Sequence, residues 1–507
     1  MSAAAGRFGR LWGRASESFA PTARRILAVK GKGATSYLQG LVTSDLLSPP
    51  VPPRPEKSLG EAKENGATEP SEPQQHPLPN LDDLYKGDQL RSTCFLDHKG
   101  RIVTDSLLWK IDEQLYYIDC PGTAADQLLQ HLQQHKLRKS KVKIKDMSNQ
   151  GMSSHVVFGT LNALGAPPGY LSALDPRHPS LGLRILKLPP PKESQDDGSE
   201  DNQPETKDFA SIMANSPFPD SPGNYELVRR LAGVAEGSEI AGKVALECNQ
   251  ENMQAVSFHK GCYLGQELTA RVQHTGVLRK RIMPLLLLDT MTEVPHIWSL
   301  ASNLQEGRAQ KRFTAEELKH KLPSDRLPRL SVLTAGNLVA VTTGSIEPEG
   351  EAVDEAAAQE LQKVRDKANA MLEDIETSCT TGAKIIDSKD GKTIGQIVSP
   401  PVKGTNVVLA LMRLDAVGLL KGGTWSKTNK VDIGDGDSKR QLRYLPYLPL
   451  WWPSLDHETG KARDEDDDGE EELLNEAREE TNKGTRRNLP RIVLEEVSAN
   501  EEEKKDS

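Results

Sequence analysis

The stretch KGCYLGQELTAR, from Lys260 to Arg271, places a cysteine between a Lys-Gly pair and an aromatic residue, with Gly-Gln-Glu close behind. Small and polar residues occupy most of the stretch, so hydrophobic packing alone does not explain the pattern. The cations Lys260 and Arg271 can supply positive potential at Cys262, which lowers a thiol pKa and favours the thiolate that binds metals. The two glycines permit backbone conformations that a Cβ would obstruct. The stretch therefore predicts a thiol on a tight turn beside a cationic surface.

Two simpler interpretations of the stretch stay open at this point. A free cysteine is most often a small buried hydrophobic residue, and Cys262 could be one. The segment 265–272 is predicted to open a helix, which would place Glu267 and Arg271 on one face because they are four positions apart. That pair belongs either to a binding face or to a surface ion pair that contributes under ~1 kcal/mol.

The cysteines limit what the thiol can do alone. They are odd in number, far apart and free of any C-x-x-C pair, which argues against a disulfide framework and a structural zinc site and favours a reducing compartment: Cys94, Cys120, Cys248, Cys262 and Cys379. An iron–sulfur cluster generally needs about four thiolates or equivalent ligands. Cluster chemistry at Cys262 must therefore take its other ligands from a partner or a small molecule.

The composition predicts a folded part interrupted by long disordered insertions. Of the 507 residues, only 36% are hydrophobic and 5% are aromatic. Proline and charged residues dominate at about 48–80 and 189–224, and such segments bury too little apolar surface to offset their chain entropy. A third insertion, at about 302–376, ends in an amphipathic helix over 355–376, whose apolar face is formed by four side chains: Leu361, Val364, Ala368 and Met371.

The two ends of the chain are predicted to lie outside the fold. Residues 1–25 carry five arginines and one acid, with apolar side chains at helical spacing, which is the pattern of a mitochondrial presequence. A basic N-terminus without a targeting role is the alternative. The segment 454–507 is predicted to be an acidic, mostly disordered tail, and it carries much of the net charge of −9. No stretch approaches the ~20 apolar residues of a membrane span.

The remaining sequence predicts an α+β region over 26–285 and a small β-barrel over 286–453. Predicted strands lie at 25–31, 92–111 (a hairpin), 114–121, 141–148, 154–160, 280–288, 331–343, 383–388, 392–400 and 406–414. Predicted helices lie at 34–47, 123–137, with Leu128, Leu129, Leu132 and Leu137 inward, and from 225 onward.

The run ALECNQENMQAVSFHKGCYLGQELTARVQHTGVLRKRIMP, at 245–284, resembles the YgfZ family, and within it the mitochondrial members that assist late iron–sulfur cluster assembly. The mark of these members is a K-G-C-Y-x-G-Q-E core. This sequence matches the core at Lys260, Gly261, Cys262, Tyr263, Gly265, Gln266 and Glu267. The segments 27–45, 95–109 and 394–414 resemble the family's N-terminal strand and helix, its central hairpin and its terminal barrel.

The resemblance implies an α+β, T-protein-like fold, which is the folate-binding fold of the glycine cleavage aminomethyltransferase, with a small C-terminal β-barrel. It implies tetrahydrofolate as a possible cofactor in a central cavity. The implied folate-binding candidates are Glu247, Lys260, Gln266 and Arg271. The T-protein has an acidic pair near the hairpin, whereas here Thr104 precedes Asp105 and one carboxylate of the pair is absent.

The resemblance also implies a maturation factor of the mitochondrial matrix that works with A-type iron–sulfur carrier proteins. Such factors support 4Fe-4S cluster insertion into client apoproteins of the aconitase type and the lipoate- or biotin-synthase type. Cys262 is the implied functional thiol and metal ligand, in a transient cluster shared with the carrier. No catalytic residue is predicted, and neither a membrane nor a nucleic acid is an expected partner.

Two other functions remain open. A tetrahydrofolate-dependent aminomethyl or one-carbon transferase fits the T-protein-like fold, although the T-protein lacks the cysteine core. An RNA-modification accessory factor has local support only from the basic residues at 279–281, and such a patch is more often a solvated strand end. Nucleotide hydrolysis is not indicated, because the segment 237–244 ends in valine where a phosphate loop needs serine or threonine.

Overall fold

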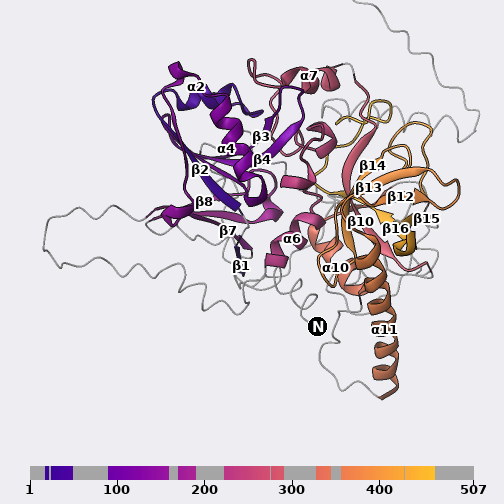
Figure 1. Cartoon of the computed structure of the whole chain (residues 1–507). Helices are drawn as coiled ribbons and strands as arrows, with labels where there is room; N and C mark the ends of the chain where they lie inside the picture. Colours follow the sequence, from indigo (N-terminus) through magenta and orange to yellow (C-terminus); the bar gives the residue numbers. More distant parts are fainter. Residues whose placement is uncertain are drawn as a thin grey trace, which may run out of the picture. The chain divides into compact units, whose positions relative to one another are not determined.

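The computed structural model describes residues 18–21, 24–48, 89–158, 169–189, 222–274, 276–290, 327–343, 355–426, 429–434 and 436–462. In Figure 1 the indigo and magenta ribbons form two antiparallel sheets with their helices, and the orange and yellow ribbons form a barrel. The predicted insertions at about 48–80 and 189–224 lie almost entirely outside the described residues, as does most of 302–354.

A five-stranded antiparallel sheet in the order β3-β4-β5-β2-β6 carries the first helices. Its strands are β2 (Arg24–Lys30), β3 (Leu90–Leu96), β4 (Ile102–Asp112), β5 (Leu115–Pro121) and β6 (Lys143–Asp146). The helices α2 (Ala34–Gln39) and α4 (Ala125–Gln134) pack on one face of this sheet, where Leu27 and Val29 are fully buried. Leu264 joins the same apolar cluster, so the cysteine stretch lies on this face.

A second antiparallel sheet covers the other face of the first one. It has the order β1-β7-β9-β8, with β1 (Ser18–Pro21), β7 (Ser153–Phe158), β8 (Tyr170–Leu174) and β9 (Leu183–Lys187). Because alternate strand residues point to opposite faces, Ile26 and Ala28 of β2 face this second sheet. They are buried there in one cluster with Trp109, Ala173 and Leu186.

Two helices and several short turns follow the sheets. The helices are α6 (Pro222–Leu231) and α7 (Gln266–His274). The 3₁₀ turns of the described chain are Gly122–Ala124, Arg138–Ser140, Ser148–Gln150, Pro179–Leu181, Gly237–Glu239, Leu246–Cys248 and Gly436–Ser438. Tyr225, Val228 and Leu231 of α6 are buried in the same apolar cluster as the barrel strand that begins at Lys280.

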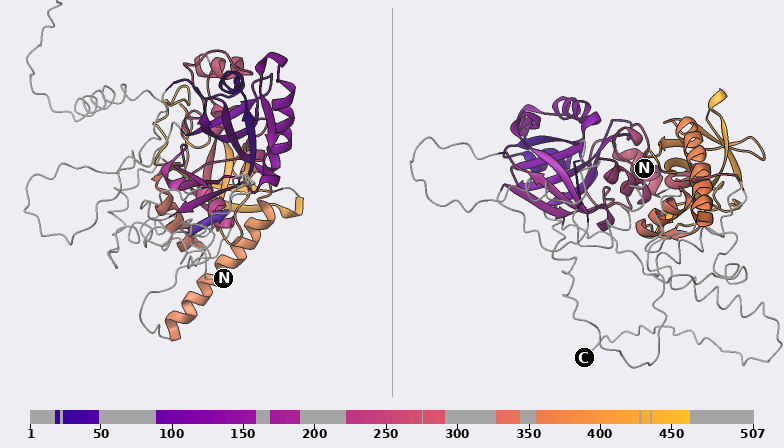
Figure 2. Two further views of the ribbon diagram at one scale, coloured as in Figure 1. Left: turned by 90° about the vertical axis from the view of Figure 1, so that its left-hand side faces the viewer. Right: turned by 90° about the horizontal axis from the view of Figure 1, so that it is seen from below.

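The C-terminal part is a closed barrel in the order β10-β14-β13-β12-β15-β16. Its strands are β10 (Lys280–Leu288), β12 (Lys384–Asp387), β13 (Thr393–Ser399), β14 (Val407–Arg413), β15 (Lys430–Ile433) and β16 (Arg440–Pro446). The short strands β11 (Arg329–Leu330) and β17 (Leu448–Pro449) pair in parallel beside it. The helices α10 (Val332–Thr342) and α11 (Glu355–Ser378) pack on the barrel, and Figure 2 shows the N-terminal turns of α11 extending beyond it.

The predicted α+β fold with a small barrel is confirmed. The predicted strands at 25–31, 92–111, 114–121 and 280–288 are β2, the β3-β4 hairpin, β5 and β10. The predicted helices at 123–137, 265–272 and 355–376 correspond to α4, α7 and α11, and the one that starts at 225 corresponds to α6. Ala368 and Met371 of the predicted apolar face of α11 are buried.

Three local predictions are wrong. The helix expected over 34–47 ends at Gln39, because the next residues turn and Val42 forms a β-bridge with Phe95. The strand expected over 331–343 is the helix α10. Most of its described residues are buried, on every side of the helix, so its sequence lacks the hydrophobic period that distinguishes a helix from a strand. Leu137, expected inward, follows the end of α4 and is 57% exposed.

The predicted segment boundaries differ from the structure at three places. The range 1–25 includes β1 and the first two residues of β2. The side chain of Arg24, the first residue of β2, is buried and forms an ion pair with Asp119. The barrel begins at Lys280, because β10 pairs with β14 and β16 along its length. Residues 454–462 belong to the fold, since the turn closed by Leu455 and Ala462 accepts two backbone hydrogen bonds from outside it. The amide of Leu278, before β10, donates to the Thr459 carbonyl, and the amide of Lys421, after β14, donates to the His457 carbonyl. Within the described residues, no helix is long and apolar enough to span a bilayer.

Candidate functional site

Lys260 fixes the start of the cysteine stretch to the fold. Its Nζ donates hydrogen bonds to the carbonyl oxygens of Gln39 (2.8 Å), Val42 (2.6 Å) and Ser44 (2.9 Å). The ammonium also lies 4.8 Å from the centre of the Tyr263 ring, a cation–π geometry. Burial lowers the pKa of Lys260 to about 8, and Asp45 acts in the opposite direction. The ammonium group of Lys260 therefore bonds to the backbone inside the fold and is not exposed beside the thiol.

Backbone contacts hold the rest of the loop against the segment after α2. The amide of Leu264 donates to the Gly40 carbonyl at 3.0 Å, and the amide of Ser257 donates to the Thr43 carbonyl at 3.0 Å. The Thr43 hydroxyl donates to the Ala255 carbonyl at 2.5 Å. These bonds tie the loop at 255–264 to residues 39–44 from both sides. The thiol thus lies on a loop whose backbone is fixed.

Two close glycines join the loop to the β3-β4 hairpin. Gly265 has φ +79°, and a Cβ there would lie 2.5 Å from the Asp97 carbonyl oxygen. Gly100, at the hairpin turn, has φ +77°, and a Cβ there would lie 2.5 Å from the Cβ of Leu268. Both positions therefore require glycine for conformation and for space. At Gly261 the φ is not positive and a Cβ would meet none of the described atoms within 4 Å, so this position lacks both constraints.

Cys262 is exposed, whereas the other four cysteines are buried. Burial raises the pKa of those four thiols, to about 12 for Cys120, to about 11 for Cys379, and well above the usual range for Cys94 and Cys248. The buried thiols are thus held in the neutral form, which neither binds metals nor attacks electrophiles. Cys262 is the accessible thiol of the five.

A surface cavity of about 740 Å³ opens beside Cys262. Residues from three segments line it: Gly33, Ser36, Tyr37, Gly40 and Leu41 around α2, then Gln134, His135, Leu137, Lys139 and Ser140 after α4, and Cys262, Tyr263 and Leu264. None of these described lining residues is a carboxylate. The cavity therefore exposes a thiol, an imidazole and an apolar side chain within a neutral-to-basic wall.

His135 has a defined tautomer at this cavity. Its Nδ1 lies 2.9 Å from the carbonyl oxygen of His131, and a carbonyl only accepts, so Nδ1 carries the proton. In the neutral ring this leaves the Nε2 lone pair free to accept a hydrogen bond or bind a metal. The two histidine rings lie 4.5 Å apart, and burial lowers the pKa of His131 to about 4.

The residues predicted to bind folate lie in different environments. Glu247 is partly buried in a 3₁₀ turn, where burial raises its pKa against the opposing charges of Lys280 and Arg101. Gln266 and Arg271 lie on α7. Lys260 does not fit a folate wall, because its ammonium group already donates three hydrogen bonds to the backbone.

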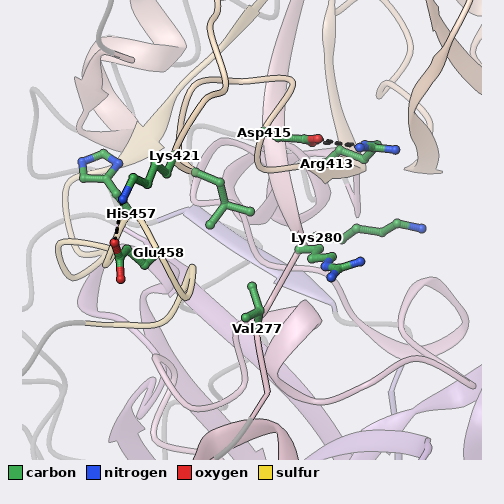
Figure 3. Close-up of a pocket in the computed structure, with 9 residues that line it drawn as sticks. Val277, Lys280, Arg413, Asp415, Lys421, His457 and Glu458 are labelled. Atoms are coloured by element: carbon green, nitrogen blue, oxygen red, sulfur yellow. Dashed lines mark hydrogen bonds and ion pairs between the residues drawn. The ribbon is translucent and has the colours of Figure 1, made fainter.

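A second cavity, of about 500 Å³, lies at the barrel entrance next to Lys280. Figure 3 shows that Arg413 pairs with Asp415 and that Lys421 pairs with Glu458, the latter at 3.0 Å. Its remaining lining residues are Val277, Arg279, Lys280, Leu420 and His457. None of the four predicted folate residues lines this cavity or the one beside Cys262.

The interior contains an ion network that the sequence does not indicate. Arg24 bonds Asp119 at 2.6 Å and Glu236 at 3.2 Å, and Arg184 bonds Asp175 at 2.7 Å. The remaining members are Asp105, Arg177 and Tyr225. Burial and then Glu236 raise the pKa of Asp105. The sequence shows a cation inside an apolar strand, as in LRILK of β9, but it does not show the partners of that cation.

No protein-family model matches the chain. Two curated relatives, both named "Iron-sulfur cluster assembly factor IBA57 homolog, mitochondrial", come from Neosartorya fischeri and Mycosarcoma maydis. The first is 29% identical over 294 residues, or 52% of this chain and 56% of the relative. The second is 30% identical over 319 residues, or 59% of this chain and 66% of the relative.

The chain thus spans between about half and two thirds of the length of these relatives. Among solved structures, the glycine cleavage system aminomethyltransferase T from Bartonella henselae superposes with a TM-score of 0.43 and 9% identity. The superposition covers 90% of this chain and 91% of that one. In sequence, the chain is similar to proteins named as mitochondrial iron–sulfur cluster assembly factors.

Proposed function

We propose that this protein is a mitochondrial iron–sulfur cluster assembly factor in which Cys262 contributes a thiolate to a cluster shared with another protein. The observation that carries the proposal is the exposure of Cys262 beside an open cavity, while every other cysteine is buried. A thiolate at the surface can reach iron that a second protein holds. The relatives named as assembly factors support the same function.

The partner follows from the ligand count. A cluster generally needs about four thiolates or equivalent ligands. Cys94, Cys120, Cys248 and Cys379 are buried and cannot join Cys262 at the surface. We therefore propose that A-type iron–sulfur carrier proteins in the mitochondrial matrix supply the other ligands, and that the clients are 4Fe-4S apoproteins of the aconitase and lipoate- or biotin-synthase types.

The residues around Cys262 position the thiol and perform no chemistry of their own in this proposal. Lys260 and Gly265 fix the two ends of the loop, through three hydrogen bonds at one end and close packing on the hairpin at the other. A fixed loop loses little conformational entropy when a partner binds, which favours transfer between proteins. Tetrahydrofolate binding stays a prediction, supported by the partly buried Glu247 and its basic neighbours.

The test mixes the full-length protein with a cluster-loaded A-type carrier under anaerobic conditions. Gel filtration with absorbance detection should show a coloured complex of the two proteins. Cys262→Ser should abolish the colour in that complex and the activation of an apo-aconitase by the mixture, because a hydroxyl is a poor iron ligand.

Cys379→Ala is the matched control, because it removes a buried thiol and leaves Cys262 unchanged. It should form the coloured complex at the wild-type level. If Cys262→Ser forms the same coloured complex and activates aconitase equally well, Cys262 is not the ligand and the proposal fails.

A further inference from the structure

One cation lines the Cys262 cavity and four more are next to its lining residues in the sequence, and we call this set the basic rim. Its members are Lys32, Lys136, Arg138, Lys139 and Lys141, all exposed. Among the described residues, none of them forms an ion pair. The formal net charge of the whole chain is −9, but the acidic segment 454–507 accounts for it and the rim lies outside that segment.

The fold brings the rim to the cavity by close backbone packing. A Cβ at Gly33 would lie 2.1 Å from the Ser140 carbonyl oxygen, and one at Gly31 would lie 2.1 Å from that of Lys141. The turn after α4 therefore lies directly on the residues that start α2. Lys139 itself lines the cavity together with Cys262.

An apolar side chain lies within this basic surface. Leu137 is 57% exposed, lines the cavity, and stands in the chain between two members of the rim. Protein interfaces commonly combine an apolar centre with a polar or charged edge. An exposed leucine at a cavity with a cationic edge has this arrangement.

The aromatic residues of the cavity favour a protein partner over a nucleic acid. Proteins that bind single strands present exposed aromatic side chains for base stacking. The two tyrosines of the cavity, Tyr37 and Tyr263, are each only 8% exposed and do not offer ring faces to solvent.

We propose that the basic rim and Leu137 form the docking surface for an acidic face of the protein that shares its cluster with Cys262. This inference rests on the proposed function and adds where the partner binds and by what chemistry. Charge attraction between the two faces steers association, while the cavity lets the partner's metal ligands approach the thiol. The partner's acidic face is the single occupant to which the proposal commits.

The strand after the rim supplies a matched control. Lys143 and Lys145 of β6 are exposed and lie opposite Lys30 and Ala28 in the pairing with β2. Ala28 faces the second sheet, so Lys143 and Lys145 project from the opposite side of the sheet to α2 and α4. Reversing these charges changes the net charge equally without altering the cavity.

The experiment measures the affinity of the full-length protein for the cluster-loaded A-type carrier in three variants. Arg138→Glu with Lys139→Glu should weaken binding about tenfold or more, and Leu137→Ala should weaken it severalfold. Lys143→Glu with Lys145→Glu should bind within about twofold of wild type. Wild-type binding should weaken as salt increases, and the rim variant should lose most of this dependence. Thermal unfolding confirms that all variants fold.

Carbodiimide cross-linking gives an independent readout, since it joins a lysine only to a carboxylate in direct contact. Mass spectrometry should find carrier carboxylates joined to Lys136, Lys139 or Lys141, and none joined to Lys143 or Lys145. Equal affinity of the rim variant and wild type, or cross-links only at the control lysines, overturns the inference. Tighter binding of a 20-nucleotide RNA than of the carrier, or a wild-type dimer that the rim variant dissociates, also overturns it.

These outcomes are separable from failure of the proposed function. If the rim variant binds the carrier like wild type but the coloured complex still needs Cys262, only the proposed docking surface is wrong. If the coloured complex forms without Cys262, the proposed function is wrong, whatever affinity the rim variants have for the carrier.

Discussion

At the scale of single residues, Lys260 shows how a cation beside a cysteine can serve the fold. From the sequence, we expect its charge to act on the thiol. In the structure its ammonium group donates to three carbonyl oxygens of the segment after α2 and is 7% exposed. Three carbonyl groups that face inward need a donor, and one lysine satisfies all of them. The K-G-C-Y core therefore contains a structural lysine and an exposed thiol two positions apart.

Lys260→Met should destabilise the protein by about 3 kcal/mol or more, because methionine fills the space but leaves buried carbonyl oxygens without a donor. Urea unfolding measures the loss, and hydrogen exchange should show faster exchange at the Leu264 amide. Lys136→Met is the control, because Lys136 is exposed. Equal stability of the two variants would show that the three hydrogen bonds contribute little.

At the scale of elements, the hairpin turn and the N-terminus of α7 fit together through two glycines. Gly100 and Gly265 both have positive φ. Each lacks a Cβ that would collide with atoms of the other segment. The sequence resemblance named the hairpin and the cysteine stretch as separate marks. In the structure these two segments contact each other at the two glycines.

Gly265→Ala should cost at least about 2 kcal/mol, since alanine is strained at φ +79° and its Cβ would lie 2.5 Å from the Asp97 carbonyl. Gly261→Ala is the paired substitution in the same loop, with open space and no positive φ, and it should stay within about 0.5 kcal/mol of wild type. Urea midpoints compare the two. If both alanines cost the same, the close approach does not stabilise the fold.

Elements with a clear period were predictable, and those set by distant contacts were not. The β3-β4 hairpin was predicted from alternation around a turn, and the helix α11 from helical spacing. The helix expected over 34–47 stops early because Val42 pairs with Phe95 and Thr43 bonds the Ala255 carbonyl, and both partners are remote in sequence. In the site, the exposed thiol could be inferred from its polar neighbours, whereas the cavity required the turn after α4.

At the scale of the whole molecule, buried charges and aromatic contacts connect segments that are far apart in the chain. Arg24 joins β2 to Asp119 of β5 and to Glu236 after α6. No local pattern predicts such a network, because each ion is stabilised only by partners that the fold brings together. His178 forms a further link, since its ring lies 5.6 Å from that of Trp451 in the C-terminal part.

His178 makes this link sensitive to acid. Burial lowers its pKa to about 3, with Asp175 acting in the opposite direction. The Ser180 amide donates to its Nδ1 at 3.1 Å, which requires an unprotonated nitrogen. The folded state therefore keeps the ring neutral, while the unfolded chain binds a proton below about pH 6.5. The stability from this group is complete above that pH and falls as the pH decreases towards 3.

Between pH 7.5 and pH 5.0, the neutral ring of His178 should account for about 2 kcal/mol of lost stability. His178→Asn keeps an acceptor for the Ser180 amide but cannot titrate, so its urea midpoint, followed by tryptophan fluorescence, should change less between the two pH values than that of wild type. The exposed His259 provides the control, because His259→Asn should retain the wild-type pH dependence. An unchanged dependence in His178→Asn would mean that this ring accepts its proton without unfolding the contact to Trp451.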